Sequence, residues 1–456
     1  MIRARSPLAA RRAVALAAAV CAACASTLPQ THVDPNAPDL AASELEARAD
    51  AFWRSLQSHA LAEATARFSA TLRAQVSSAQ FATAWTGLEG QFGVFTAWSV
   101  TSRSNKDGVV VLQQELRFER LHRDHFLNAV MSVQVKTGEI TGLALSPAAP
   151  RPTPPPPADA PFTAEEVHFG NAPWILPGTL TLPKSTAGAP AGLRPAVLLL
   201  GSSGAEDRDE SVGANKPARD IAEALASQGV VVLRYDKRAF VYPAKMDRRT
   251  QTISDELIDD GIAAITYLQG RPEVDKAKVF IAGHGLAASV APEVARPRMP
   301  IAGLILLAPP ARHPLQVLAN QLRYLGAPAE QAQALEKVDR QLTMRQFNPE
   351  DFVLGAPVSY WDDLEKRNEI AIARSLGIAA LILRGDRDFQ ILDSDVHGWV
   401  RGLDGGSRVQ QQTFPGLNHL FMTGVGRPGP QEYDTAGEVD AVVIARIRKF
   451  IASQQE

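Results

Sequence analysis

Two hydrophobic patterns follow one another between residues 40 and 147. Apolar residues first recur at the spacing of one helical face, at Leu45, Ala49, Phe52 and Leu56. They then alternate with mostly polar neighbours, as half-buried strands do, at Val110, Leu112, Leu116 and Phe118 and again at Ala129, Met131, Val133 and Val135. Helices followed by antiparallel strands predict a small α+β domain over residues 40–147.

Proline then interrupts every pattern. The segment from Ser146 to Phe162 reads SPAAPRPTPPPPADAPF, and prolines at this density favour an extended polyproline II conformation. We therefore predict a semi-rigid linker over residues 148–161 and a second domain over residues 162–456.

Beyond the linker, short runs that are apolar at nearly every position replace the alternating ones. They are PAVLLLG (195–201), VVVLRYD (230–236), KVFIAG (278–283), GLILLAP (303–309) and AALILRG (379–385), followed by the more polar RVQQQTF (408–414). Continuous apolar strands are typical of a parallel sheet that is buried on both faces, and helical patterns separate them here. The pattern predicts a doubly wound, mostly parallel α/β sheet with a helical insertion at about residues 310–375.

The first 25 residues have the pattern of a secretory signal. A basic segment, MIRARSPLAARR, precedes the apolar AVALAAAVCAACA, which is short for a membrane span, although a single anchor helix is the alternative. Cys21 and Cys24 are the two cysteines of the chain, so the remainder has no disulfide. Because CAAC resembles a bacterial lipobox, Cys24 is a candidate for lipidation. We expect an exported protein, either periplasmic or an outer-membrane lipoprotein.

Composition excludes one class of partner. The formal net charge is -2, and basic residues do not cluster outside the N-terminus, so the chain lacks the charge of a nucleic-acid-binding protein. We expect a small molecule as ligand, with membrane contact only through a lipid at Cys24.

Candidate chemistry collects where the predicted strands end, which is where doubly wound sheets bind ligands. GSSGAEDRDE follows the first long strand and GHGLAAS the third, while RGDRDFQ and FPGLNHLF place Asp388 and His419 after the last two. A histidine held by a carboxylate can act as a general base. The alternative is a turn aspartate and a solvent-facing loop histidine.

Taken together and in this order, these segments resemble the exported carboxylesterases of the α/β-hydrolase superfamily, from Phe162 to the C-terminus. The resemblance implies a Ser-Asp-His triad in chain order, with the acid at Asp388, the base at His419 and the nucleophile at Gly285. It also implies no cofactor and no metal. The preceding domain resembles the cystatin-like or nuclear-transport-factor-like modules of some exported bacterial hydrolases.

The nucleophile position departs from the superfamily pattern. G-x-S-x-G reads Gly283-His284-Gly285-Leu286-Ala287 here. Glycine adopts the positive φ of this sharp turn without a Cβ penalty, so we expect the turn to persist without its hydroxyl. The backbone N–H groups of Ser203 and Leu286 would form the oxyanion hole, and Ser202 or Ser203 is a possible substitute nucleophile.

Two functions remain open from the sequence. The first is a carboxylic ester hydrolase that is weak or uses an unusual nucleophile, and the second is an inactive pseudohydrolase that binds an ester or acyl ligand. They differ in whether Ser202 or Ser203 reaches His419: a hydroxyl within about 3 Å of the imidazole would favour the hydrolase, and its absence the pseudohydrolase. We expect the native chain to stay near background and Gly285→Ser to gain activity that depends on His419.

The segment HRDH, from His122 to His125, is more typical of a solvated hairpin than of a metal site.

Overall fold

The computed structural model describes residues 38–454, except 93, 107, 119–126, 148–155, 185–191, 243–244, 247–249, 297–299, 328, 349–350, 354–355 and 405–407. Several sequence predictions lie outside these residues: the signal segment 1–25, the lipidation site Cys24, the HRDH segment and most of the linker. No helix in the described part of the chain is long and apolar enough to cross a membrane.

The chain divides into two compact units, Met1–Arg151 and Pro152–Glu456. The N-terminal unit contains α2 (Ala42–Gln57), α3 (Leu61–Ala66), α4 (Ala70–Gln75), α5 (Ser78–Phe92), β1 (Phe95–Lys106), β2 (Val109–Phe118), β3 (Leu127–Gln134) and β4 (Ile140–Pro147). The strands form an antiparallel meander in the order β1-β2-β3-β4. Its core is rich in aromatic side chains, with Phe52, Trp53 and Trp85 almost fully buried.

The C-terminal unit contains an eight-stranded sheet in the order β14-β13-β10-β9-β7-β8-β6-β5. Its strands are β5 (Phe162–Asn171), β6 (Trp174–Pro183), β7 (Arg194–Leu200), β8 (Val231–Tyr235), β9 (Val274–His284), β10 (Gly303–Leu307), β13 (Ala379–Gly385) and β14 (Val409–Phe414). Pairing is parallel from β14 to β8 and antiparallel for β8-β6 and β6-β5.

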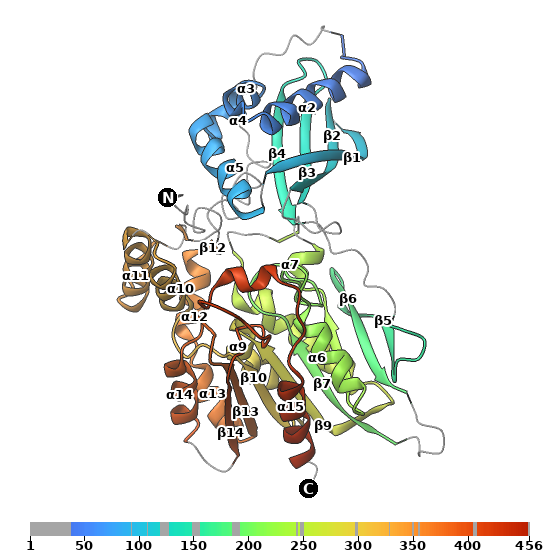
Figure 1. Ribbon diagram of the computed structural model, residues 1–456, viewed down its shortest axis with the longest axis vertical. Coiled ribbons are helices and arrows are strands. Elements are labelled where there is room, and N and C mark those ends of the chain that lie inside the picture. Colours follow the sequence, from blue (N-terminus) through green and yellow to red (C-terminus); the bar gives the residue numbers. More distant parts are fainter. Residues whose placement is uncertain are drawn as a thin grey trace. The chain divides into compact units, whose positions relative to one another are not determined.

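Helices cover both faces of this sheet (Figure 1). They are α6 (Pro217–Ala226), α7 (Arg238–Val241), the π-helix η2 (Ser254–Ile258), α8 (Asp259–Gln269), α9 (Leu286–Ala295), α14 (Asp393–Gly402) and α15 (Ala441–Ser453), with the 3₁₀ helix η3 (Pro430–Asp434). On β7, Leu198 and Leu200 join the core with α8, α9 and α14, whereas Val197 and Leu199 join the core with α6 and α15. The sheet is therefore doubly wound.

The insertion between β10 and β13 is helical. It comprises α10 (Pro314–Tyr324), α11 (Ala329–Thr343), the short strands β11 (Phe352–Val353) and β12 (Ala356–Pro357), α12 (Val358–Lys366) and α13 (Glu369–Leu376). The predicted fold class is confirmed, namely a mostly parallel α/β-hydrolase sheet with a helical cap insertion, preceded by a small domain built on an antiparallel sheet.

Two strand predictions need revision. The expected strand Leu176–Pro183 begins earlier, at Trp174, and pairs with an edge strand, β5, that the sequence did not indicate. The pattern of β5 is weak because Phe162, Val167 and Phe169 are its buried side chains. The third apolar run extends back to Val274, through a register irregularity against β7.

Candidate active site

The turn at Gly285 joins β9 directly to α9. Gly285 has φ 56° and ψ −122°, and its N–H donates to the carbonyl of Leu307 on the neighbouring strand. A side chain is hard to place here because this φ disfavours any residue with a Cβ. Gly283 is also required, since a Cβ there would lie 2.5 Å from the carbonyl oxygen of Ala287. The sharp turn expected from the sequence is therefore present without its serine.

Asp388 and His419 follow the neighbouring parallel strands β13 and β14, and their side chains meet. His419 Nδ1 lies 2.7 Å from Asp388 Oδ2. The other carboxylate oxygen accepts the N–H groups of Gln390 and Ile391 at 2.8 and 3.0 Å. Burial alone would raise the pKa of Asp388, but His419 and these hydrogen bonds outweigh it and lower the pKa. The ionised carboxylate therefore holds the imidazole with Nε2 free to face the site.

The free imidazole nitrogen faces the turn. A Cβ built on Gly285 would lie 3.8 Å from His419 Nε2. The distance from a hydroxyl on that Cβ to Nε2 would depend on the χ1 rotamer of the side chain. The structure thus brings Gly285, Asp388 and His419 together at one edge of the sheet, where the sequence placed them.

Ser202 occupies the space left by the missing side chain. Its Oγ lies 2.7 Å from the Cβ position of Gly285, closer than two such atoms approach without a shift. Ser202 is half-buried, whereas Ser203 is exposed. Ser289 is directed elsewhere, because its hydroxyl donates to the carbonyl of Pro310 at 2.8 Å. Of Ser202, Ser203 and Ser289, Ser202 is therefore the one whose hydroxyl is shown to lie at the turn.

Buried charged side chains hold the backbone around Ser202. The N–H of Ser202 donates to Glu210 Oε1 at 3.3 Å, and Lys237 Nζ donates to the carbonyl of Ser202 at 2.5 Å. The N–H of Gly204 donates to Glu256 Oε1 at 2.6 Å, and Lys237 donates to the same oxygen at 3.2 Å. The hydroxyl of Tyr360, in the insertion, donates to Glu256 Oε2 at 2.7 Å. We call Glu210, Lys237 and Glu256 the charged frame.

His284 links this frame to His419. Its Nδ1 lies 2.8 Å from Glu210 Oε1, and its Nε2 lies 3.0 Å from the carbonyl oxygen of His419. Burial alone would lower the pKa of His284, but the Glu210 carboxylate outweighs it and raises the pKa to about 9. The ring therefore carries both protons at neutral pH and donates in both directions. It also lies against the His419 ring, with centroids 4.5 Å apart.

Hydrogen bonds already use two N–H groups beside the predicted oxyanion hole. Carboxylates accept those of Ser202 and Gly204, in the loop after β7. The N–H of Leu286, in the first turn of α9, has no acceptor within the helix. Among the described hydrogen bonds, none uses the N–H of Ser203. The N–H groups of Ser203 and Leu286 therefore remain the candidate donors.

No sequence motif indicated the charged frame. Charged residues of the segments DRDE and RYDKR pair with one another, as in the buried pair of Arg234 with Asp209. What the sequence did not indicate is that Glu210 and Lys237 contact the backbone of Ser202. The available signal was their position, Lys237 two residues after β8 and Glu210 in the loop that follows β7. Glu256 gave no signal, because it lies in a π-helical segment away from any motif.

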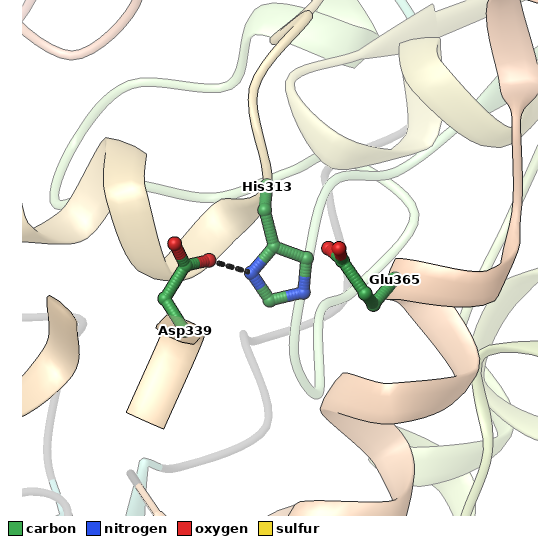
Figure 2. A group of neighbouring side chains, drawn as sticks. All are labelled: His313, Asp339 and Glu365. Atoms are coloured by element: carbon green, nitrogen blue, oxygen red, sulfur yellow. Dashed lines mark ion pairs between the residues drawn. The ribbon is translucent and has the colours of Figure 1, made fainter. Parts of the chain in front are cut away.

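The insertion contains a group of metal-ligand side chains, in which ligand atoms of His313, Asp339 and Glu365 all lie within 4.8 Å of one another. His313 Nδ1 lies 3.2 Å from Asp339 Oδ1, and Nε2 lies 3.2 Å from the carbonyl of Trp361. Figure 2 shows the imidazole between the two carboxylates. Both ring nitrogens of His313 already have a protein partner, Asp339 at Nδ1 and the carbonyl of Trp361 at Nε2.

The aromatic residues of the insertion pack against the main domain. Tyr360 and Trp361 are buried in the core that also contains α8 and α9. Tyr324 stacks on Phe389, next to Asp388, with ring centroids 5.6 Å apart. The insertion therefore contacts residues that flank the candidate site. Its Tyr360 is connected to the site by the hydrogen bond to Glu256.

Comparisons with known proteins give one clear relative. No known family profile matches the chain. Esterase EstD of Thermotoga maritima is 39% identical over 279 residues, which cover 60% of this chain and 65% of EstD, just under two thirds of its length. The chain is therefore esterase-like in sequence over the matched residues.

Solved structures resemble the chain more distantly. A Pyrococcus furiosus esterase, Pf2001, is 16% identical with a TM-score of 0.43, covering 68% of this chain and 96% of its own. Est1E from Butyrivibrio proteoclasticus is 17% identical with a TM-score of 0.42, covering 64% and 98%. A Mycobacterium tuberculosis puromycin-hydrolyzing peptidase is 14% identical with a TM-score of 0.45, covering 79% and 48%.

Proposed function

We propose that the C-terminal unit is a carboxylic ester hydrolase that uses Asp388 and His419 but no serine at the turn after β9. One observation carries this proposal. The Asp388–His419 pair is hydrogen-bonded at 2.7 Å, and the free nitrogen of the imidazole lies 3.8 Å from the Cβ position of Gly285. The identity to an esterase, 39% over 279 residues, supports an ester as the substrate class.

The site contains the parts that ester hydrolysis requires, apart from an elbow serine. Asp388 fixes the tautomer of His419, so that Nε2 can take a proton from a hydroxyl and later deliver it to the leaving alcohol. The N–H groups of Ser203 and Leu286 would stabilise the oxyanion that forms when the ester carbonyl is attacked. These residues bind, orient and move protons without a cofactor.

A second function follows from the same departure. Gly285 has no hydroxyl, and hydrolases that lose a triad member retain only about 10³–10⁴-fold catalysis over water. A pseudohydrolase would keep Asp388 and His419 and bind a small ester or acyl ligand without turning it over. Gly285 itself is the observation that favours this alternative.

The cellular location of the protein and the class of its N-terminal unit are proposals from the sequence. We propose an exported protein, periplasmic or attached to the outer membrane through Cys24, because the first 25 residues have the pattern of a signal. The N-terminal unit would belong to the cystatin-like or nuclear-transport-factor-like modules. Its helices and four-stranded antiparallel sheet are compatible with either.

The test is hydrolysis of short-chain p-nitrophenyl esters by the purified chain, beside His419→Ala. The hydrolase proposal predicts turnover above background that His419→Ala lowers by about 10²–10⁴-fold, the range that a general base contributes. No turnover by a folded native chain, together with a rise in melting temperature when the ester is added, would instead support the pseudohydrolase.

A further inference from the structure

We propose that Ser202 supplies the nucleophilic hydroxyl in place of the missing elbow serine, so that the catalytic centre is rearranged rather than incomplete. This inference rests on the proposed function, since it names the group that attacks the ester. In this account, the absence of a side chain at Gly285 leaves space for the hydroxyl of Ser202.

The first argument is spatial. The Cβ that an elbow serine would carry lies 2.7 Å from Ser202 Oγ and 3.8 Å from His419 Nε2. The hydroxyl of Ser202 and the base therefore border the same small space. A serine at residue 285 would crowd Ser202 out of it, so glycine at 285 and a hydroxyl at 202 are compatible where two serines would conflict.

The second argument is how firmly the backbone of Ser202 is held. Its N–H donates to Glu210 and its carbonyl accepts from Lys237. The side chains of Glu210 and Lys237 are 7% and 1% exposed. Burying charged side chains has a large desolvation penalty. Holding an ordinary loop in place would not require buried charges on both sides of one residue. Catalytic groups need such support because small displacements lower their rates.

Backbone strain occurs in the same loop. Glu210 has φ 55°, a left-handed conformation that a residue with a long side chain rarely adopts. Such strain persists only where surrounding contacts fix it, and it is concentrated at functional sites. Here the strained residue is the one whose carboxylate accepts the N–H of Ser202.

The third argument is a continuous connection between Ser202 and the base. Glu210 accepts from Ser202 on one side and from His284 on the other, and His284 donates to the carbonyl of His419. One set of buried hydrogen bonds thus positions both the loop that contains Ser202 and the loop that contains His419. His284 and Glu210 are positioning residues in this account.

No hydrogen bond joins Ser202 Oγ to His419 among the described residues, and such contacts often tighten only when substrate is bound. Rotation about the χ1 angle of Ser202 moves Oγ without disturbing the backbone contacts that hold the residue. The competing serines lack these features, because Ser203 is exposed and Ser289 donates to the carbonyl of Pro310.

The reaction balances with these residues alone. Ser202 Oγ transfers its proton to His419 Nε2 and bonds to the ester carbonyl carbon, whose π electron pair moves onto the carbonyl oxygen. Collapse of this tetrahedral intermediate breaks the bond to the alkoxy oxygen, which leaves as the alcohol with the proton from His419. Water then gives a proton to His419 and bonds to the acyl carbon. The bond from that carbon to Ser202 Oγ breaks, Oγ takes the proton back from His419, and the carboxylic acid leaves.

The test combines covalent labelling with hydrolysis. The purified chain, Ser202→Ala, His419→Ala and the control Ser227→Ala are treated with a fluorophosphonate, which loses fluoride when a hydroxyl attacks phosphorus. Ser227 is exposed and donates to a carbonyl at the end of α6, away from the site. Fragmentation of the labelled peptide then identifies the modified serine, and p-nitrophenyl ester hydrolysis is measured on the same samples.

We expect the label on Ser202 in the native chain and in Ser227→Ala. Ser202→Ala should lose both the label and at least about 100-fold in hydrolysis rate, as for loss of an attacking group. Hydrolysis that depends on His419 but survives Ser202→Ala, or a label on Ser203, would overturn the role of Ser202 and leave the hydrolase proposal intact. Absence of both label and hydrolysis in the folded native chain would overturn the two proposals together.

Discussion

The two halves of the candidate site are built in different ways. At the ends of β13 and β14, the base half depends on one short hydrogen bond between Asp388 and His419, supported by backbone N–H groups. At the ends of β7 and β9, the nucleophile half lacks its usual hydroxyl and is surrounded by the charged frame. The nucleophile half, which departs from the superfamily pattern, therefore contains more buried charged side chains than the base half.

This contrast indicates that losing one side chain has not dismantled the site. A turn without function would be free to relax, yet Gly285 keeps φ 56° and still presents its Cβ direction to His419. Buried ion pairs such as Lys237 with Glu256 contribute little net stability compared with apolar packing. Their place around Ser202 is better explained by positioning than by stability.

The largest expected effect breaks the base half. Asp388→Asn keeps the shape of the side chain but no longer fixes the tautomer of His419 with a charge, which should lower kcat by about 10⁴-fold. The measurement is ester hydrolysis by the folded variant. Activity within tenfold of native would show that the Asp388–His419 pair is not the working base.

Removing the cation of the frame should destabilise the protein. Lys237→Met leaves Glu256 buried without its partner, and breaking a buried pair in this way costs about 3–5 kcal/mol. The matched control is Lys278→Met, whose pair with Asp275 is partly exposed and should change stability by less than about 1 kcal/mol. Urea denaturation of both variants measures the difference. Equal stabilities would mean that the frame does not hold the loop.

Gly285→Ala sharpens the spatial argument because it adds a Cβ and no hydroxyl. The new atom would meet Ser202 Oγ at 2.7 Å in a backbone conformation that disfavours side chains. We expect a loss of about 1–3 kcal/mol in stability from the strained φ. We also expect lower ester hydrolysis, because Ser202 is displaced. Hydrolysis equal to native would argue that the position of Ser202 is irrelevant.

The smallest predicted effect concerns pH. Burial, and then the nearby Glu210 carboxylate, raises the pKa of Glu206 to about 8, and its Oε2 has no hydrogen-bond partner. Between its ordinary pKa of 4.5 and about 8, Glu206 is ionised in the unfolded chain but protonated in the folded one. Native stability should therefore fall as pH rises through this window, by at most about 1.4 kcal/mol per pH unit from this group.

Glu206→Gln removes that dependence. The variant and the native chain should be similarly stable near pH 4.5, and the variant should become relatively more stable up to pH 8. Denaturation curves at several pH values measure the difference between the two proteins, in which the other titrating groups cancel. A constant difference across the window would show that Glu206 ionises normally.

How much the sequence could predict differs between the same regions. The apolar runs predicted the strands of the parallel sheet because side chains on both faces are buried, and the order of motifs placed Asp388 and His419 at neighbouring strand ends. Strand β5 was missed because few of its side chains are buried. The charged frame could not be predicted, since Glu210, Lys237 and Glu256 come from separate segments that only the strand order brings together. Likewise, the closeness of Ser202 to Gly285 depends on a three-dimensional distance.

The most direct test of the central claim is to restore the missing hydroxyl. Ester hydrolysis is measured for Gly285→Ser and for Gly285→Ser combined with His419→Ala. If His419 is a base aimed at this turn, the single variant should hydrolyse the ester with the serine at residue 285 as its nucleophile, even though that serine displaces Ser202. The double variant should lose about 10²–10⁴-fold of that rate. A folded Gly285→Ser that hydrolyses no ester, or whose activity His419→Ala leaves unchanged, would contradict the account.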